Sequence, residues 1–416
     1  MSVLKTARTA WAVFRRLVAS GRSRRRLAEV LRDVAPLPDG SIRVAVYFAD
    51  DAVNLYQLRQ WYAPLVELNK KWPVAILSRN VGGTLKLLQE SPVHVQYVRL
   101  VDDLERFIDS QEVAIVLYVN QNARNFQMFR YARMFHVFIN HGESDKMYMT
   151  TNQFKAYDYA FIAGDAARQR LSSKLWDYDL DTRTFSVGRP QADHLAGELP
   201  YTPDDRTVVL YSPTWEGDRP AAHYGSVVTH GEALVSALLA TGRHRVIYRP
   251  HPRSGVVDPA YGAANHRIIA AIAAANTADP AAQHIYDAEG AIGWQLAAAD
   301  VAITDVSAMV YDRLATGKPI IVTRPVSPLA EVDEQGYLGS AEWLLACDAP
   351  AVAAAVDRVL TSESAHSTLN YWVERHFGDT TPGAATARFE GAIETLMARW
   401  DEFDRATPVV HDPLTS

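Results

Sequence analysis

Two histidine-containing stretches combine the residue types that phosphate chemistry uses. The first spans residues 141–146 (HGESDK) and directly follows an apolar run. An imidazole with an ordinary pKa of about 6.5 can take a proton from an attacking hydroxyl near neutral pH, which makes His141 a candidate general base. Lys146 could hold a phosphate as a point charge. The stretch is also compatible with a loop histidine that is bonded to nearby backbone.

The second stretch spans residues 249–253 (RPHPR) and also follows an apolar run. Its two prolines restrict the backbone, so Arg249, His251 and Arg253 could project together from one short loop. Guanidinium groups form charge-assisted and often bidentate hydrogen bonds with phosphate oxygens. The spacing therefore favours a phosphate-binding loop over the alternative, a rigid surface turn with solvated arginines.

A third candidate lies at a predicted helix start. Residues 305–308 (DVSA) follow a short apolar run and open a helical stretch that carries Asp312. Asp305 or Ser307 can accept hydrogen bonds from the first free N–H groups of that helix and so act as its N-cap. The same helix N-terminus could bind a pyrophosphate, with Ser307 as a further donor.

A fourth stretch, residues 211–217 (YSPTWEG), ends another apolar run and offers the hydroxyls of Ser212 and Thr214. Trp215 in the same stretch could belong to the core or form a wall on which a base stacks. The sequence contains no Walker loop, no HExxH zinc motif and no GxSxG nucleophile elbow. These absences direct attention to the four strand-end stretches.

The elements that position these stretches follow from the pattern along the chain. From residue 42 onward, short apolar runs alternate with helical stretches, which is typical of βα units and parallel sheets. The predicted strands are 42–49, 72–78, 93–100, 113–119, 137–140 and 159–163, then 207–211, 245–248, 284–286, 301–304 and 319–323. The predicted helices include 53–70, 268–275 and 291–298. Ligands bind at the carboxyl ends of the strands in such sheets, where all four stretches lie.

The predicted fold class is therefore α/β, with two doubly wound, Rossmann-like lobes that face a cleft. The polar segment 195–206, which contains two prolines, has the composition of a linker. We expect an N-terminal helix at 1–35, a first lobe at 40–195, a second lobe at 205–360, further helices at 361–400 and a loose tail at 401–416.

Composition excludes several classes of protein. The 416 residues are 48% hydrophobic and 22% charged, which excludes a largely disordered chain. A single cysteine, Cys347, forbids an intrachain disulfide and favours a reducing compartment. The net charge of −6 gives no support for a nucleic-acid binder. Asp50 and Asp51 could ligate a metal, but such a pair more often begins a loop, so we expect neither a metal nor another cofactor.

The N-terminus differs from the rest of the chain. Residues 1–33 hold nine Lys or Arg against two acidic residues, a net charge of +7. On a helical wheel, Trp11, Phe14 and Leu17 share one face, opposite to basic side chains. Such a helix can lie in a membrane interface, drawn by anionic lipid. No apolar run of about 20 residues occurs, so we expect peripheral contact with an anionic membrane surface. The alternative is a helix docked on the protein's own core.

Taken in order, the motifs resemble those of the CDP-glycerol glycerophosphotransferases of teichoic-acid and capsule-polymer synthesis. That family's pattern includes an HG…K loop, a GxPxxD turn, a YxPT strand end, an RPHP loop and an ITD-x-S helix start. The corresponding stretches here are 141–146, 188–193, 211–214, 249–252 and 303–307. The resemblance covers about residues 136–325, and the ordered set is far more specific than any single motif.

The resemblance implies a GT-B fold whose second lobe holds most of the donor. It implies transfer of glycerol phosphate, or a related polyol phosphate, from a CDP-polyol to a hydroxyl of a lipid-linked or glycan acceptor, with CMP leaving. His141 would be the general base, and His251 with Arg249 would hold the donor phosphates. Further donor or phosphate contacts would come from Arg253, Ser307, Asp305, Thr214, Ser212, Asp312 and Lys146. Such an enzyme would act as a peripheral protein at the cytoplasmic face of a bacterial cell membrane.

The chain departs from the family pattern at several positions. The residue before the HG loop is Asn140 instead of tryptophan, and Glu216 stands where an arginine can follow the PT motif. Glu143 and Asp145, beside the presumed base, suggest an acceptor other than plain polyglycerophosphate. Two alternative functions stay open. One is a GT-B glycosyltransferase that uses a nucleotide sugar, and the other is a non-catalytic, membrane-associated partner of a polymer-export complex.

Overall fold

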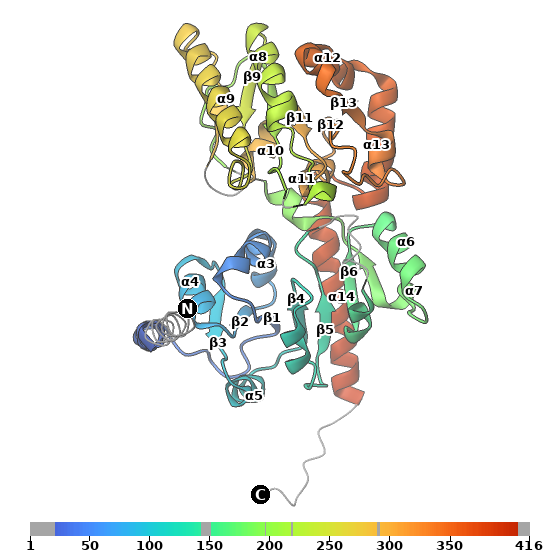
Figure 1. Ribbon diagram of the computed structural model, residues 1–416. Helices are drawn as coiled ribbons and strands as arrows, with labels where there is room; N and C mark the ends of the chain where they lie inside the picture. Colours follow the sequence, from blue (N-terminus) through green and yellow to red (C-terminus); the bar gives the residue numbers. More distant parts are fainter. Residues whose placement is uncertain (1–20, 143–150, 196, 218, 289–291, 407–416) are drawn as a thin grey trace, which may run out of the picture.

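The computed structural model describes residues 21–142, 151–195, 197–217, 219–288 and 292–406. Two parallel β-sheets form two lobes, and a long C-terminal helix runs from the junction between them along the first lobe (Figure 1). This confirms the predicted α/β class with two Rossmann-like lobes. The first twenty residues of the expected basic helix lie outside the described residues, as does Lys146.

The first lobe contains a seven-stranded sheet with the order β3-β2-β1-β4-β5-β6-β7. Its strands are β1 (Val44–Phe48), β2 (Val74–Ser78), β3 (His94–Tyr97), β4 (Ile115–Tyr118), β5 (Phe135–Phe138), β6 (Tyr159–Ile162) and β7 (Thr184–Ser186). Its α-helices are α2 (Leu55–Arg59), α3 (Tyr62–Asn69), α4 (Val81–Glu90), α5 (Val101–Ser110), α6 (Asp165–Lys174) and α7 (Leu180–Arg183). Every neighbouring pair of strands is parallel, so the carboxyl ends of all seven strands lie at one edge.

The second lobe contains a six-stranded parallel sheet with the order β10-β9-β8-β11-β12-β13. Its strands are β8 (Thr207–Ser212), β9 (His244–Tyr248), β10 (Ile285–Tyr286), β11 (Val301–Thr304), β12 (Ile320–Thr323) and β13 (Glu342–Leu344). Its helices are α8 (Glu232–Ala240), α9 (Pro259–Ala278), α10 (Trp294–Ala298), α11 (Ala308–Leu314), α12 (Val352–Thr361) and α13 (Glu363–Phe377). A short π-helical segment, Val227–Gly231, precedes α8.

The central strands are buried on both faces because helices cover both sides of each sheet. All five residues of β1 are buried, and so are all four of β11. This arrangement explains why these strands read in the sequence as continuous apolar runs instead of alternating patterns. Each sheet thereby forms a rigid support for the loops at its carboxyl edge.

The C-terminal helix α14 (Ala384–Ala406) returns to the first lobe. Phe389, Ile393 and Leu396 are fully buried in the first lobe's core together with strands β1 and β4. Asp401 pairs with Arg43 at 3.2 Å at the far end of the helix. The first six residues of the tail that we expected to be loose are therefore helical, because they continue this packed helix.

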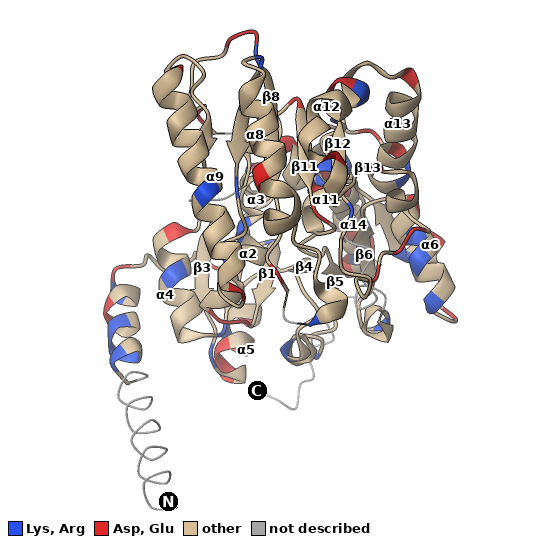
Figure 2. Ribbon diagram, turned by 45° about the horizontal axis from the view of Figure 1, so that its top comes forward, with Lys and Arg blue, Asp and Glu red and all other residues tan. Residues whose placement is uncertain are grey.

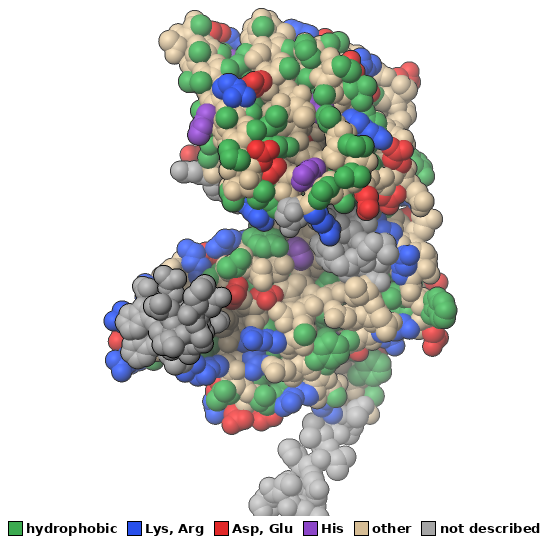
Figure 3. Space-filling view, viewed as in Figure 1, with side chains coloured by type: hydrophobic (Ala, Val, Ile, Leu, Met, Phe, Trp, Pro, Cys, Tyr) green, Lys and Arg blue, Asp and Glu red, His purple; other side chains and the backbone are tan. Residues whose placement is uncertain are grey.

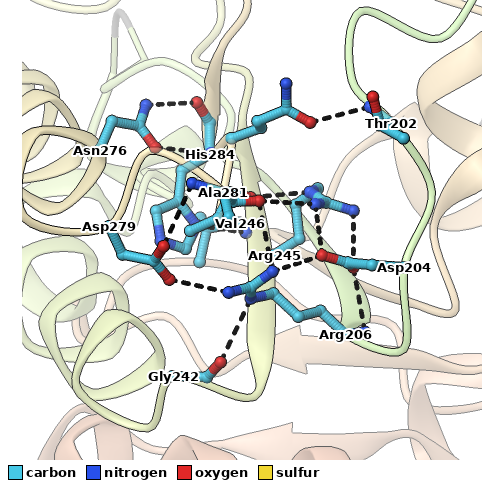
Figure 4. A network of polar contacts seen from close by, with 12 residues as sticks. Thr202, Asp204, Arg206, Gly242, Arg245, Val246, Asn276, Asp279, Ala281 and His284 are labelled. Atoms are coloured by element: carbon cyan, nitrogen blue, oxygen red, sulfur yellow. Dashed lines mark hydrogen bonds and ion pairs between the residues drawn. The ribbon is translucent and has the colours of Figure 1, made fainter.

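The predicted linker is fixed to the second lobe instead of moving freely. Asp204 forms a bidentate pair with Arg245, a fully buried residue of β9, at 3.0 and 2.9 Å (Figure 4). Arg206 reaches Asp279 at 2.7 Å, beyond the end of α9. The polar composition of 195–206 predicted a linker. In the structure, one of its carboxylates, Asp204, pairs with the buried guanidinium of Arg245.

One predicted helix is broken. Residues 53–70 form α2 and α3, separated at Gln60 and Trp61. Trp61 is buried and donates its indole N–H to the Asn140 carbonyl at 2.5 Å. A buried indole needs such a partner, and the contact ties this helix pair to the loop that carries His141. Strands β7 and β13, each three residues long, were not predicted.

The two carboxyl edges meet across a hollow between the lobes, which Figure 3 shows in the space-filling view. A direct ion pair joins them: Arg189, which follows β7, lies 2.5 Å from Asp312 of α11. The loops after β5, β8, β9 and β11 therefore belong to one interlobe region. These are the loops that carry the four stretches singled out above.

Candidate active site

His141 lies in the loop directly after β5, at the first-lobe edge of the hollow. The preceding residue, Asn140, has a left-handed backbone conformation with φ 56°. Asparagine adopts this conformation more readily than most other residues do. The Asn140 side-chain oxygen accepts from the His141 backbone N–H at 2.8 Å, and its amide donates to the Gly142 carbonyl at 2.6 Å. The asparagine that replaces the family's tryptophan thus shapes this turn.

The His141 imidazole is held by the backbone of β4's end. Its Nδ1 lies 3.0 Å from the carbonyl oxygen of Val119. A carbonyl can only accept, so Nδ1 carries the hydrogen, and in the neutral ring Nε2 keeps the lone pair. The ring of Tyr56 contacts His141 edge-on with centroids 6.1 Å apart. This arrangement suits a group that accepts a proton at Nε2.

His251 lies in the loop after β9, and its ring has the opposite polarity. The backbone N–H of Arg253 donates to His251 Nδ1 at 3.1 Å. Nδ1 is therefore the acceptor, and the hydrogen of the neutral ring sits on Nε2. Burial and the neighbouring Arg253 lower the pKa of His251, although Glu216 opposes this effect. Near neutral pH the ring is therefore a neutral hydrogen-bond donor through Nε2.

The two arginines of this loop are placed differently. Arg249 forms an ion pair with Asp287, and Gln295 also donates to that carboxylate. Arg253 stacks its guanidinium over the ring of Trp215 at 3.8 Å. The Arg253 guanidinium thus covers one face of the Trp215 ring, so a nucleotide base cannot stack on that face.

Glu216 holds the backbone that follows the His251 loop. This residue is only 4% exposed, and its carboxylate accepts from the backbone N–H groups of Gly255, Val257 and Asp258 at 2.8–3.0 Å. Burial acts to raise the pKa of Glu216, but the backbone hydrogen bonds outweigh it and the pKa is lowered. Ser254, within this loop, has a buried hydroxyl with no hydrogen-bond partner in the described ranges. Sequence reasoning missed both as parts of the site, although Glu216 had been noted as a departure from the family.

Asp305 does not reach the hollow, which corrects its assignment as a phosphate contact. It is fully buried, and its carboxylate accepts from the backbone N–H groups of Thr214 at 2.7 Å and Ser226 at 3.0 Å. The Thr323 hydroxyl donates to its other oxygen at 2.5 Å. Burial raises the pKa of Asp305 to about 6, against these hydrogen bonds. A negative carboxylate would repel phosphate in any case, and here it anchors two loops.

Ser307 is the N-cap of α11, where its hydroxyl accepts from the Met309 N–H at 3.3 Å. The capping role is thus taken by Ser307 and not by Asp305. Ser212 is buried at the end of β8, whereas Thr214 is partly exposed two residues later. The structure brings Thr214 and Ser307 to the same edge of the sheet, because β8 and β11 are neighbouring strands.

Asp312 links the two lobes through its ion pair with Arg189. Both side chains are less than one-fifth exposed. Arg189 belongs to the GxPxxD turn. Gly188 in this turn has φ 74°, and a Cβ there would lie 2.9 Å from the Phe377 carbonyl oxygen. Asp193 of the same turn accepts from the Thr386 N–H at 2.7 Å, near the start of α14. The turn therefore fixes the place where the chain crosses back to the first lobe.

Within the described ranges, no three His, Cys, Asp or Glu side chains are grouped as a metal site would require. Among those same residues, no helix is long and apolar enough to cross a membrane.

Comparison with known families gives one match. The family model described as CDP-glycerol:poly(glycerophosphate) glycerophosphotransferase matches residues 140–325. This region includes both histidine loops, the GxPxxD turn and the start of α11. The match confirms the resemblance drawn from the motifs over this part of the chain. No curated protein matches the sequence.

Comparison with solved structures shows the fold. The structure of the wall teichoic acid polymerase TagF is similar with a TM-score of 0.56 and 13% identity, covering 92% of this chain and 98% of that one. A variant of that polymerase with a histidine replaced by asparagine, in a structure with CDPG, has a TM-score of 0.55 and 12% identity over 92% and 98% of the two chains. A UDP-N-acetylglucosamine 2-epimerase from Listeria monocytogenes has a TM-score of 0.56 and 14% identity over 89% and 100%. The fold is GT-B-like, and at these identities the likeness extends no further.

Proposed function

We propose that this chain, an enzyme of the CDP-glycerol glycerophosphotransferase type, transfers glycerol phosphate or a related polyol phosphate from a CDP-activated donor to a hydroxyl of a lipid-linked or glycan acceptor. The products are CMP and an acceptor extended through a phosphodiester. The polymer made would be of the teichoic-acid or capsule type. The observation that carries the proposal is the pair of histidine loops on facing lobes, within the region matched by the family model.

In the proposed step, the acceptor hydroxyl attacks the phosphorus of the donor that bears the glycerol. A new acceptor O–P bond forms and the bond from that phosphorus to the bridging oxygen of CMP breaks. His141 Nε2 takes the hydroxyl proton, because its Nδ1–H is already bonded to the Val119 carbonyl. CMP leaves with the electron pair of the broken bond. A positioned general base contributes roughly 10²–10⁴-fold in such reactions.

The second lobe would hold the donor phosphates. His251 would donate from Nε2 to a phosphate oxygen, supported by Arg249 and Arg253 of the same loop. The hydroxyls of Ser307 and Thr214 lie after the neighbouring strands β11 and β8 and would complete the contacts. Phosphoryl transfer depends mainly on positioning and on stabilising charge at the phosphate oxygens, which donors of this kind supply.

The basic N-terminus would bring the enzyme to its acceptor. Residues 21–32 are helical, and the side chains of Arg22, Arg24, Arg25 and Arg26 are exposed on this helix while Leu27 is buried. Figure 2 shows basic positions, in blue, along the helix beside α4. Each basic residue near an anionic surface is worth about 1 kcal/mol of binding. We propose that the enzyme lies peripherally at the cytoplasmic face of the membrane, where it would bind a lipid-linked acceptor.

The membrane proposal is tested by flotation with vesicles of stated composition. The purified chain should float with vesicles that contain anionic phosphatidylglycerol and remain behind with neutral phosphatidylcholine. Replacing Arg24, Arg25 and Arg26 by glutamate should abolish flotation, whereas the same reversal at the exposed Arg106, Arg267 and Arg405 should preserve it. Equal flotation of both triple variants would contradict the proposal.

The reaction is tested by nucleotide release from the purified chain with membrane lipid acceptors. CDP-glycerol, CDP-ribitol and a panel of UDP-sugars are supplied in turn. We expect CMP from a CDP-polyol, and only with acceptor present. Release of UDP from a sugar donor would identify a GT-B glycosyltransferase instead, and binding of no donor at all would favour a non-catalytic partner.

A further inference from the structure

A set of amide and carboxylate side chains lies beside His141 and has no role in the donor chemistry above. These side chains follow β1 and β4 at the carboxyl edge of the first lobe. Asp50 accepts from the Asn122 side-chain amide at 2.8 Å and from the Asn120 amide at 2.7 Å, one bond to each carboxylate oxygen. The Asn120 amide also reaches the Gln57 side-chain oxygen at 2.7 Å. The network is therefore pre-organised on rigid strand ends.

The network reaches His141 in two ways. Asn120 directly follows Val119, whose carbonyl holds the His141 ring. Gln57 donates to the Tyr56 hydroxyl at 3.3 Å, and the Tyr56 ring contacts His141. A group bound on this network would therefore lie next to the atom that takes the proton. That is where the acceptor end must be held.

The network has bonding capacity left for a ligand. A carboxylate oxygen can accept about two hydrogen bonds, so each Asp50 oxygen keeps one site for a hydroxyl donor. Gln121, the next residue after Asn120, has a buried side-chain N–H₂ with no hydrogen-bond partner in the described part of the chain. Tyr56 is 50% exposed and offers the face or edge of a ring. Side chains that both donate and accept, with a ring beside them, match the hydroxyls and C–H faces of a sugar or polyol.

Charge argues against a phosphate in the same place. Asp50 and the exposed Asp51 place two carboxylates at the end of β1. One guanidinium lies nearby, because Arg124 donates to the carbonyl of Ala49, the residue before Asp50, at 3.4 Å. Arg79 is bonded to the Tyr47 hydroxyl at 2.9 Å. A phosphodiester would meet a net negative charge here, in contrast to the arginine loop of the second lobe.

We infer that this network is the acceptor subsite and that it takes a neutral, polyhydroxylated end, such as a sugar, instead of a glycerol-phosphate chain. The inference rests on the proposed function and names its acceptor class. The enzyme would then add polyol phosphate to a glycosyl end in preference to extending a polyphosphodiester.

The test compares two synthetic lipid acceptors in the CMP-release assay with CDP-glycerol and the full chain. One acceptor ends in a neutral disaccharide and the other in an oligomer of glycerol phosphate. We expect kcat/KM to be at least about tenfold higher for the neutral end, the equivalent of about 1.4 kcal/mol. A higher value for the phosphate oligomer would overturn the inference while leaving the transfer reaction established. No CMP from either acceptor, with or without added membrane lipid, would overturn the proposed function itself.

Variants locate the subsite. Asp50→Asn removes the charge and Asn120→Ala removes the central amide. Each should raise KM for the neutral acceptor about tenfold, the effect of one lost hydrogen bond, while the affinity for CDP-glycerol measured by calorimetry stays unchanged. Asp109→Asn, at an exposed position of α5 on the opposite edge of the lobe, is the matched control. Unchanged KM in both subsite variants, or a loss of donor affinity, would place the acceptor elsewhere.

Discussion

Both histidine loops follow the carboxyl end of a parallel strand, β5 in the first lobe and β9 in the second, yet their imidazoles are held in opposite ways. In the first lobe a backbone carbonyl accepts from His141 Nδ1. In the second lobe a backbone N–H donates to His251 Nδ1. The first ring therefore presents a lone pair at Nε2 and the second presents an N–H. The backbone group opposite Nδ1 decides whether a strand-end histidine is a base or a donor.

The loops also differ in what supports them. The His141 loop is shaped by the uncharged side chains of Asn140 and Trp61. The His251 loop and its neighbours rest on two buried carboxylates, Glu216 and Asp305. We therefore expect that protonating or replacing these carboxylates will change the conformation of the second lobe's loops, whereas the His141 loop has no such carboxylate support among the side chains named here.

The largest effect is expected for His141→Ala. Turnover should fall by about 10³-fold or more because the acceptor hydroxyl loses its base, while calorimetry should find donor affinity within about twofold of the parent. His266→Ala, at an exposed position of α9, is the control. Retained turnover would remove His141 from the chemistry.

His251→Ala should lower both donor affinity and turnover, by about 10²-fold in kcat/KM, which is the usual cost of a lost donor to developing charge. His251→Gln keeps an N–H near the Nε2 position and should recover part of the loss. Steady-state kinetics at varied CDP-glycerol distinguish the two variants. If His251→Ala left donor affinity intact, the contrast between the loops would fail.

Asp305 should make stability depend on pH. Its folded-state pKa of about 6 lies above the ordinary value of about 3.9, so the folded state binds more protons between these values. The contribution of Asp305 to the free energy of unfolding is therefore largest at low pH and falls as pH rises from about 4 to about 6, by roughly 2–3 kcal/mol.

Chemical denaturation of the parent and of Asp305→Asn at several pH values isolates this effect. The asparagine can accept from Thr214 and Ser226 and donate to Thr323, so its difference from the parent should follow the titration of one carboxyl group. A difference that is constant from pH 4 to pH 7 would show that the group does not titrate in this range.

Glu216→Gln should loosen the loop that carries His251 and Arg253. One of the carboxylate's three backbone hydrogen bonds would be lost, and we expect KM for CDP-glycerol to rise about fivefold to tenfold. Acceptor KM should not change, because the carboxylate lies on the donor lobe. Glu402→Gln, on an exposed position of α14, provides the comparison.

The smallest effect is expected at the junction of the lobes. Arg189 and Asp312 form a pair that is partly exposed, so their coupling should be about 1 kcal/mol in a double-mutant cycle. Denaturation of Arg189→Ala, Asp312→Ala and the double variant measures it. A coupling near zero would mean that this ion pair does not help to hold the lobes together.

The sequence predicted most of the central strands because they are continuous apolar runs buried on both faces. It also predicted both histidine loops and their strand-end positions. It could not show that Asp305 is buried, since a capping aspartate and a buried anchor have the same sequence context. Nor could it find Asn120 or Gln57, whose roles arise only when β1 and β4 become neighbours. The break at Trp61 depends on a contact with Asn140, far along the chain.

The opposite tautomers of the two histidines can be measured directly by ¹⁵N NMR of the chain labelled at histidine. Comparison with spectra of His141→Ala and His251→Ala assigns the two rings. Near neutral pH, we expect His141 to be protonated at Nδ1 and His251 at Nε2. Protonation of neutral His141 at Nε2, or of neutral His251 at Nδ1, would contradict the division into a base on one lobe and a phosphate donor on the other.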